Sequence, residues 1–404
     1  MVIIGSHGTG QAMQKFSDLG EKQRDLRLDL FRGLANWLIF LGHVPDSLLT
    51  WFTSRNYGFS DGADLFVFIS GYTATLVYSR MMIKRGFVVG ATRLWKRAWQ
   101  LYVAQMLLFL FYTATIHYVA HQWDLGHLMD QFNVAGLMDD PVDTLVQAMT
   151  LRFKPLNLDV LPLYIVLMSA FPFALWLLLR WPDMTMLGSV ALYFVARRFQ
   201  WNLTSYPRGY WYFDPFTWQL LFMLGGWLAL SGGRRLQRIA SSPIAMIGSV
   251  TFVVFALLVT LSDSLPALQP LVPIELRVLF VPNEKTYLAP YRVVHLLALL
   301  VLAVNLVPRN WPALTWPLLR PLIKCGQQSL EVFCVGIFLS FVAHLVLITT
   351  SDGVIVELIV GTCGILIMVA VAYYRSWSKE IDRPASGDGS IRPGCRTCGR
   401  TACP

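Results

Sequence analysis

The sequence predicts an all-α membrane protein, a polytopic bundle of about ten transmembrane helices with both termini in the cytoplasm. Composition is the first observation: 55% of the 404 residues are hydrophobic and only 14% are charged, whereas soluble domains carry about 25% charged residues. Length is the second, because apolar stretches recur from about residue 31 to residue 374, each near the length that crosses about 30 Å of hydrocarbon.

These apolar stretches divide the chain into three parts. We expect residues 1–28 to form a polar cytoplasmic tail without a secretory signal. Residues 29–376 form the transmembrane domain, and residues 377–404 form a disordered cytoplasmic tail. The predicted spans are 31–50, 62–82, 99–119, 159–180, 184–200, 215–231, 244–262, 290–307, 325–349 and 353–374. Arg197 and Arg198 shorten the fifth.

Loop charge sets the predicted orientation, because cytoplasmic loops carry an excess of Lys and Arg. With the N-terminus inside, the cytoplasmic loops contain Arg80, Lys84, Arg85, Arg93, Lys96, Arg97, Arg234, Arg235, Arg238, Arg309, Arg320, Lys324, Arg375, Lys379 and Arg383. The opposite side receives residues 120–158, with Asp124, Asp130, Asp139, Asp140 and Asp143, and the 263–289 loop. Three arginines run against this assignment, Arg197, Arg198 and Arg208.

The net charge of +9 follows from this topology and does not indicate a nucleic-acid partner, which would need a basic soluble domain. Membrane lipids are the expected partners of the basic 80–97 loop. Three of the six cysteines lie in or beside spans, and the other three, Cys395, Cys398 and Cys403, form a weak zinc pattern in the tail. We expect no metal site.

Arg32 and His43 lie eleven residues apart in the first span. Eleven helical residues advance about 1100°, close to three turns, and about 16 Å along the axis. Both side chains therefore fall on one stripe, with the Arg near one membrane face and the His inside the bilayer. Ionisable groups at that depth are costly against lipid and favour a wet cavity. The alternative is an interfacial Arg and a His that a neighbouring helix satisfies.

A second polar constellation surrounds the start of the second span. Asp61 and Asp64 precede or open it, and Ser70 lies inside it. Carboxylates at a helix N-terminus are stabilised by the helix dipole, and a functional role would be to hold the His or a hydroxyl substrate. Arg55 and Asp46 belong to the loop before it, with Asp46 on the His43 side only if the helix continues through Pro45.

Later spans carry further ionisable groups. These are Asp159, Asp214, Arg292, His295, Glu331 and His344. Each one alone is best explained by helix packing, but as a set they predict a polar cavity between helices.

The sequence resembles the acyltransferase family 3 of integral-membrane acyltransferases. That family pairs an Arg, ten residues and a His in its first helix with a motif similar to GFSDGADLFVFISGY, residues 58–72. The segments most similar to its OpgC branch are RLDLFRG (27–33), RNYGFSD (55–61), FVFISGY (66–72), LPLY (161–164), DPFTWQLLF (214–222), EKTYLAPYR (284–292) and SLEVFCVG (329–336). Gly336 stands where broader family members often carry a second His.

The resemblance implies a multi-pass enzyme of the bacterial inner membrane that transfers a succinyl group from cytoplasmic acyl-CoA to hydroxyls of periplasmic glucans. It implies acyl-CoA as a donor substrate, with no permanently bound cofactor. His43 would be a general base or a transient acyl carrier, and Arg32 would hold a CoA phosphate or orient the thioester. Arg93, Lys96 and Arg97 are further candidates for CoA phosphates.

The remaining candidates would support the reaction or bind the acceptor. They are Asp46, Arg55, Asp61, Asp64, Ser70, Arg292, His295 and Glu331, with Arg55 and Arg292 as the cations for a succinyl carboxylate. Three alternatives stay open: an O-acetyltransferase of another envelope polysaccharide, a secondary transporter, and a non-catalytic scaffold for glucan synthesis.

Overall fold

The computed structural model describes residues 25–44, 47–230, 234–350 and 353–382, and these ranges are helical apart from turns, loops and one isolated bridge between Thr204 and Tyr210. Asp46, most of the N-terminal tail and the cysteines of the C-terminal tail lie outside the described residues. The predicted all-α class is confirmed for the part of the chain that is described.

Each predicted span overlaps one long helix of the described chain. These helices are α2 (Leu26–Gly42), α3 (Gly62–Arg85), α4 (Phe87–Gln122), α8 (Val160–Arg180), α9 (Pro182–Phe199), α10 (Pro215–Leu230), α12 (Pro243–Ser264), α14 (Pro290–Leu306), α16 (Ser329–Thr349) and α17 (Val354–Ile381). Among the described residues, six helices are long and apolar enough to cross a membrane: α3, α4, α8, α12, α16 and α17. The total of ten crossings stays a prediction.

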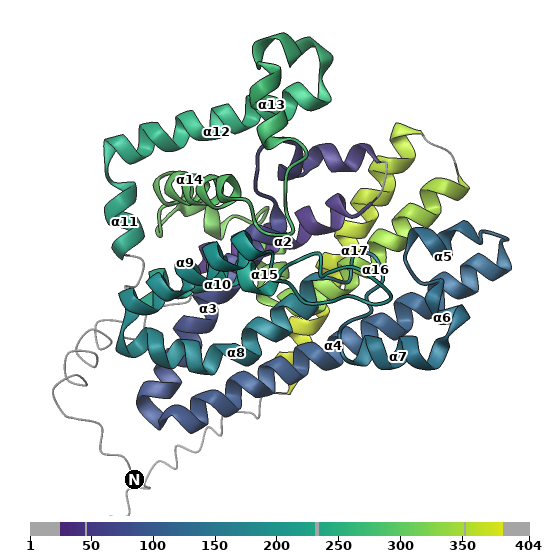
Figure 1. Cartoon of the computed structure of the whole chain (residues 1–404), viewed down its shortest axis with the longest axis horizontal. Helices are drawn as coiled ribbons and strands as arrows, with labels where there is room; N and C mark the ends of the chain where they lie inside the picture. The colour runs from purple at the N-terminus through teal and green to yellow at the C-terminus, as the bar shows by residue number, and fades with distance from the viewer. Residues whose placement is uncertain (1–24, 45–46, 231–233, 351–352, 383–404) are drawn as a thin grey trace, which may run out of the picture.

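Short helices connect the long ones. They are η1 (Leu48–Phe52), η2 (Ser54–Asn56), α5 (His127–Gln131), α6 (Gly136–Asp139), α7 (Pro141–Met149), α11 (Arg234–Ala240), η3 (Pro266–Leu271), α13 (Ile274–Phe280), η4 (Pro312–Thr315) and α15 (Arg320–Gln327). Figure 1 shows α5, α6 and α7 grouped at one side of the bundle, next to α4. The helices α12 and α13 lie at its upper edge.

The predicted first span, 31–50, was wrong at both ends. The helix begins at Leu26 because the Asp25 carboxylate caps it, accepting the backbone N–H of Arg27 at 3.2 Å. It ends at Gly42 because Pro45 in the sequence disfavours helical conformation in the residue before it and cannot donate a helical hydrogen bond. His43 is therefore the C-cap of α2 instead of a residue in the middle of a span.

Glycines allow the central helices to pack closely. A Cβ at Gly71 of α3 would overlap the backbone carbonyl of Phe222 in α10, and one at Gly225 of α10 would overlap that of Phe68 in α3. Small residues at such crossings let two helix backbones approach closely. The resulting van der Waals contact is a main force that holds helices together within membranes. The crossing places the N-terminal half of α3, which carries the second polar constellation, at the centre of the bundle.

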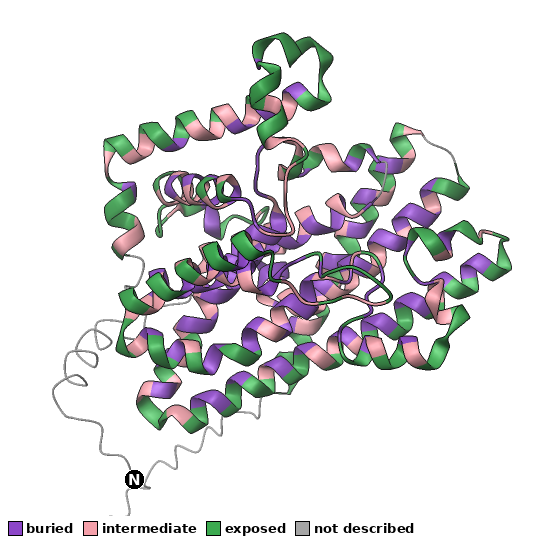
Figure 2. Cartoon of the chain, in the orientation of Figure 1, coloured by how far each residue is buried: buried purple, intermediate pink, exposed green. Residues whose placement is uncertain are grey.

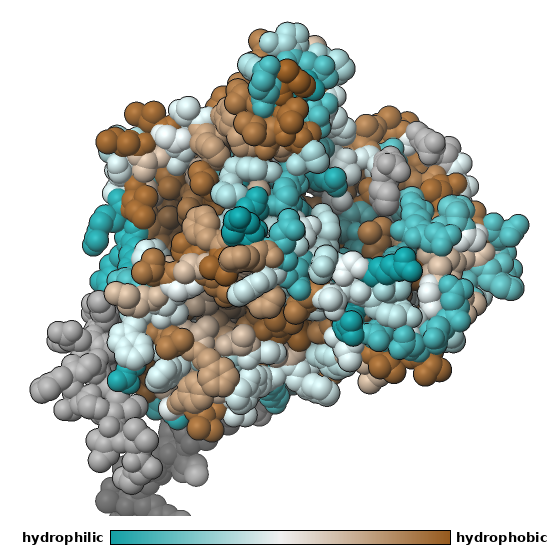
Figure 3. Space-filling view, viewed as in Figure 1, coloured by the Kyte–Doolittle hydropathy of each residue, from teal (hydrophilic) through white to brown (hydrophobic). Residues whose placement is uncertain are grey.

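Burial separates the core of the bundle from its outer faces. Figure 2 shows buried residues concentrated along the central helices and exposed ones on α13 and the outer face of α7. The side chains of Ile244, Ile247, Val254 and Leu258 recur at helical spacing on α12 and are exposed. An exposed apolar stripe of this kind is typical of a face toward lipid. In Figure 3 the hydrophilic surface gathers over α5 and α6 instead.

The three cysteines in or beside the spans differ in how far they are buried. Cys325 is buried in α15, Cys334 is half-buried in α16, and Cys363 is exposed on α17.

The helix α17 continues to Ile381, past the predicted domain end at 376. The division of the chain into two tails and one transmembrane domain stays a prediction, because most of both tails lies outside the described residues.

Candidate active site

Two cavities lie along α2, and each contains one member of the Arg32 and His43 pair. The larger, which we call the His43 cavity, has a volume of about 730 Å³. The smaller, the Arg32 cavity, has a volume of about 180 Å³. The larger volume is in the range of pockets that bind small molecules. The pair therefore shares one helix but belongs to two sites.

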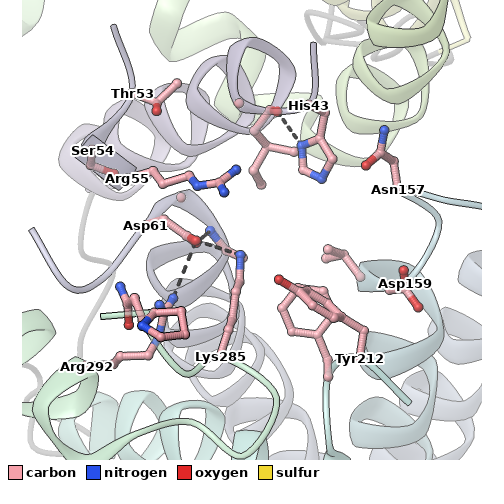
Figure 4. A pocket seen from close by; sticks show the side chains of 18 of the residues that line it. His43, Thr53, Ser54, Arg55, Asp61, Asn157, Asp159, Tyr212, Lys285 and Arg292 are labelled. Atoms are coloured by element: carbon pink, nitrogen blue, oxygen red, sulfur yellow. Dashed lines mark hydrogen bonds and ion pairs between the residues drawn. The ribbon is translucent and has the colours of Figure 1, made fainter. Parts of the chain in front are cut away.

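The His43 cavity is formed by loops from one end of the bundle. Its walls come from the segment after α2, the start of α3, the loop before α8, the loop before α10, and the α12–α14 connection. Figure 4 shows His43 and Arg55 on one side of it and Tyr212 and Asp159 on the other. All these loops belong to the side that the loop charges predict to be opposite the cytoplasm.

The His43 imidazole has a defined orientation. Its Nδ1 atom lies 2.5 Å from the carbonyl oxygen of Ile39, one turn earlier in α2. A carbonyl oxygen only accepts hydrogen bonds, so the neutral ring carries its proton on Nδ1 and its lone pair on Nε2. A backbone contact of this kind is a common device for fixing a histidine tautomer. His43 lines the cavity with the nitrogen that a general base requires left unprotonated.

Asp61 and Asp64 belong to an ion-pair network and do not hold His43. The Asp61 carboxylate lies 2.6 Å from Lys285 Nζ, and the Asp64 carboxylate lies 2.6 Å from Arg292 Nη2. Asp61 also caps α3, and Asp64 accepts the Asp61 backbone N–H at 2.8 Å in a capping box. The interpretation that these carboxylates set the tautomer of the histidine was wrong, because Ile39 occupies that position.

Arg292 and Arg55 differ in their surroundings. Arg292 is 2% exposed and contacts both Asp64 and Asp61, so its charge is balanced inside the protein. The guanidinium of Arg55 extends into the His43 cavity toward His43 in Figure 4. No ion pair of Arg55 occurs among the described side chains. Of the two predicted cations, Arg55 is the one with charge available to a substrate.

A buried cation and a carboxyl group form another part of the wall. Lys154 is buried, its Nζ lies 4.0 Å from the centre of the Trp211 ring, and Asp159 lines the same cavity. Burial lowers the pKa of Lys154 to about 8 and raises the pKa of Asp159 to about 6, while each charge partly offsets the shift of the other. Both groups therefore titrate near the physiological range.

Asn157 lies between these two groups in sequence and lines the cavity near His43 in Figure 4. Its φ of +71° is in the left-handed region, which Asn tolerates better than most residues. Its amide, which both donates and accepts hydrogen bonds, lies near the histidine at this wall of the cavity.

The Arg32 cavity gathers the second group of candidates. Arg32 Nη2 donates to Thr73 Oγ1 at 2.5 Å, and Ser70 and Arg97 line the same cavity. Arg97 is half-buried, whereas Arg93 and Lys96 are exposed on α4 and are not among the lining residues. Two guanidinium groups at one cavity suit a phosphate or a polarised carbonyl.

A layer of side chains lies where the two cavities approach each other. On α3, Ala63 lines the His43 cavity and Phe66, one turn later, lines the Arg32 cavity. On α8, Val160 lines the His43 cavity and its neighbour Leu161 lines the Arg32 cavity. The Phe66 ring lies 6.1 Å from that of Tyr164 and 5.7 Å from that of Phe333. The separation is therefore about one side-chain layer thick on each of these helices.

His295 and Glu331, two of the predicted supporting residues, line neither cavity. His295 is buried, its Nδ1 lies 2.7 Å from Ser60 Oγ, and its ring packs against Gly58. Glu331 forms ion pairs with Arg375 at 3.0 Å and Lys379 at 3.5 Å. These contacts explain His295 and Glu331 as packing residues. Asp46 lies outside the described residues.

Two ionisable residues of later spans have local structural roles. His344 Nε2 lies 3.3 Å from Gln131 Oε1 and ties α16 to the end of α5. Asp214 accepts the backbone N–H groups of Phe216 and Thr217 at 3.0 and 3.1 Å, and so caps α10.

Sequence reasoning missed many residues of the His43 cavity, among them Lys154, Asn157, Tyr212 and Lys285. Lys285 lies inside EKTYLAPYR, a segment already quoted for the family resemblance, so its position was a usable signal. Lys154 and Asn157 lie just before a span, in a loop that is mostly acidic, which was a weaker signal. The role of Ile39 depends on its backbone carbonyl, which a side-chain pattern does not reveal.

Comparison with known proteins places the chain in a family. No curated protein and no solved structure matches the chain. The family model described as OpgC protein matches residues 24–380, which is most of the chain and includes every described residue that lines the two cavities. The family indicates a membrane acyltransferase that acts in glucan modification. The resemblance found in the sequence is confirmed, and the chain belongs to the OpgC family.

Proposed function

We propose that this protein transfers a succinyl group from cytoplasmic succinyl-CoA, through the bundle, to hydroxyl groups of periplasmic glucans at the bacterial inner membrane. The observation that carries the proposal is the division of α2 between two cavities, with Arg32 in one and His43 in the other. A donor and an acceptor from opposite sides of a membrane require two entrances and one meeting point.

The donor would enter the Arg32 cavity. Arg32 and Arg97 are cations at its wall, and guanidinium groups bind phosphate in two-point geometry. Ser70 and Thr73 add hydroxyls beside them. The pantetheine arm is long, thin and amphipathic, so it would pass the layer around Phe66 and present its thioester on the His43 side. The nucleotide, which carries the charge, would stay at the cytoplasmic end.

The reaction would occur at His43. The lone pair of Nε2 accepts the proton of a glucan hydroxyl as that oxygen bonds to the thioester carbonyl carbon. The tetrahedral intermediate then collapses, the carbon–sulfur bond breaks, and the imidazolium returns its proton to the departing CoA thiolate. The products are a glucan succinyl ester and free CoA. Asn157 near the imidazole supplies an amide N–H for the negative oxygen of the intermediate.

Arg55 supports succinyl as the acyl group. A succinyl donor carries a free carboxylate that an acetyl donor lacks, and burying that charge requires a partner. Arg55 extends into the His43 cavity, whereas Arg292 and Lys285 are paired with Asp64 and Asp61. A guanidinium near the reacting histidine is suited to a carboxylate through two parallel hydrogen bonds.

The test is mass spectrometry of periplasmic glucans from cells in which the gene is deleted, restored, or restored as His43→Ala. The matched control is His117→Ala, because His117 is exposed on α4 and lines neither cavity. Membrane insertion of each variant is checked by the amount of protein in the membrane fraction.

We expect the mass of a succinyl ester on glucans only with the intact protein and with His117→Ala. The mass of an acetyl ester in its place would assign an acetyl donor and overturn the succinyl assignment. Glucans that are identical with and without the gene would overturn the acceptor. Substitution that persists in His43→Ala would overturn the role of the histidine.

A further inference from the structure

The loop before α10 contains four consecutive aromatic residues with alternating exposure. Tyr210 is 63% exposed and Tyr212 is 50% exposed, whereas Trp211 and Phe213 between and after them are 3% and 5% exposed. Alternation of this kind follows from extended backbone, in which successive side chains point to opposite faces. One face of the segment anchors it in the protein, and the other presents two tyrosine rings.

Backbone contacts hold this segment in place. Leu203 O accepts the N–H of Trp211 at 2.9 Å, and Gly209 O accepts the N–H of Ser205 at 3.0 Å, which closes a short hairpin. The turn uses Gly209 at a φ of +95°, a conformation that favours glycine. Lys154 lies over the buried Trp211 ring at 4.0 Å. The tyrosines therefore extend from a base that is already ordered.

Both exposed tyrosines line the His43 cavity. In Figure 4 the Tyr212 side chain faces the centre of the cavity, across from His43 and beside Lys285. Asp263 and Asn283 line the same cavity and add polar groups. Rings that face a polar cavity of about 730 Å³ contact a ligand of both apolar and polar character.

We propose that Tyr210 and Tyr212 form a stacking platform for a sugar ring of an oligosaccharide acceptor, next to the sugar that receives the acyl group. This inference rests on the proposed function and adds a binding subsite to it. The C–H bonds on one face of a pyranose pack against an aromatic ring, while the hydroxyls on its edge bind polar groups. Tyrosine offers a large contact area at low entropic cost because it has few rotatable bonds.

An interfacial belt is the other explanation for exposed aromatic residues, since Tyr and Trp gather at membrane–water boundaries. Trp201 on the same loop fits that explanation: it is 49% exposed, lies against Phe199, and is not a lining residue of the His43 cavity. Tyr210 and Tyr212 differ from it because they line the cavity. The loop thus supplies its own control residue.

The test measures binding of a linear glucan pentasaccharide and of methyl glucoside to the full-length protein in lipid nanodiscs, by isothermal titration calorimetry. Nanodiscs avoid detergents with sugar head groups, which would compete for the platform. The variants are Tyr212→Ala, Tyr212→Phe, Tyr210→Ala and, as the control, Trp201→Ala.

We expect Tyr212→Ala and Tyr210→Ala each to weaken pentasaccharide binding about tenfold, which is the loss of one aromatic contact of about 1.4 kcal/mol. Tyr212→Phe and Trp201→Ala should bind the pentasaccharide as the native protein does. Methyl glucoside binding should be the same in all variants. Unchanged pentasaccharide binding in both alanine variants would overturn the platform. Equal losses in Tyr212→Phe and Tyr212→Ala would overturn stacking.

A parallel assay of acyl transfer to both acceptors separates this inference from the proposed function. Transfer by the native protein without an effect of the tyrosine variants overturns the platform and leaves the function standing. Tyrosine-dependent binding of the pentasaccharide without acyl transfer to any acceptor overturns the function and leaves the platform standing.

Discussion

Arg32 lies in α2 and His43 is the C-cap of the same helix, yet Arg32 lines one cavity and His43 lines another. The helix α2 is thus a wall shared by both cavities, with a side-chain layer around Phe66 where they approach each other. A single-site enzyme would have no need of this division. A transferase with substrates on opposite sides of a membrane requires it, because each substrate keeps its own entrance.

Loss of the His43 ring should remove catalysis without removing the fold. We expect His43→Ala to lower the rate of succinyl transfer about 10²–10⁴-fold, the usual contribution of a positioned general base. Added imidazole should restore part of the rate in His43→Ala, because it can occupy the vacated space and accept the proton. The measurement is transfer of labelled succinyl to glucan. A His43→Ala protein within a few-fold of the native rate would contradict the assignment.

Arg55 should distinguish donors. We expect Arg55→Ala to raise KM for succinyl-CoA about 10–100-fold, because a hydrogen-bonded ion contact contributes about 1.5–3 kcal/mol. The KM for acetyl-CoA should stay the same, since acetyl has no carboxylate. The control is Arg208→Ala, an exposed arginine that does not line the His43 cavity. Equal effects of Arg55→Ala on both donors would exclude carboxylate recognition.

The buried pair of Arg292 and Asp64 should be essential for stability as a pair. We expect Arg292→Met to destabilise the protein by about 3–5 kcal/mol, because it leaves the fully buried Asp64 carboxylate without its cation. The double variant Arg292→Met with Asp64→Asn should recover more than half of that loss. Thermal unfolding in detergent measures both. A single variant as stable as the native protein would refute the ion-pair account.

Asp159 should make stability depend on pH. Its pKa in the folded protein is raised from the ordinary 3.8 to about 6 because it is buried, so folding favours the protonated form. The stability that the protonated Asp159 contributes is fully present below about pH 3.8 and is lost as the pH rises through about 6. We therefore expect Asp159→Asn, which cannot ionise, to raise the thermal midpoint at neutral pH.

Near pH 3.8, where Asp159 is largely protonated in the folded protein, Asp159→Asn and the native protein should unfold at similar temperatures. Lys154 acts in the opposite direction: its pKa is lowered to about 8, so its contribution is present at high pH and is lost as the pH falls through that value. Relative to the native protein, Lys154→Met should therefore be more stabilising at neutral pH than at alkaline pH.

If Asp159→Asn changes the thermal midpoint equally at acidic and neutral pH, the raised pKa of Asp159 is contradicted.

Much of the architecture was predictable because hydropathy and charge act locally along the chain. The length of each apolar stretch predicted a helix, and the structure has a long helix at every predicted span. The local sequence also predicted that Arg32 and His43 belong to one helix. The end of the first helix was predicted wrongly, although its cause, Pro45, is also local. Apolar residues that continue to residue 50 predict a longer span, but the proline ends the helix before them.

The predicted cluster of ionisable residues was only partly correct. His43, Arg55, Asp61 and Arg292 do line one cavity. Glu331 pairs instead with Arg375 and Lys379, since α17 packs beside α16 and brings those cations to it. Such pairings depend on which helices become neighbours, and a single sequence does not state that.

The sequence by itself determined the membrane class, the all-α fold, the approximate positions of the long helices and the pairing of Arg32 with His43, because these follow from residues near one another in the chain. Only the tertiary structure decided that the pair opens into two cavities and that Lys285 neutralises Asp61 from 224 positions away. Contacts over such separations depend on how helices cross and where loops end, and those are properties of the packed bundle.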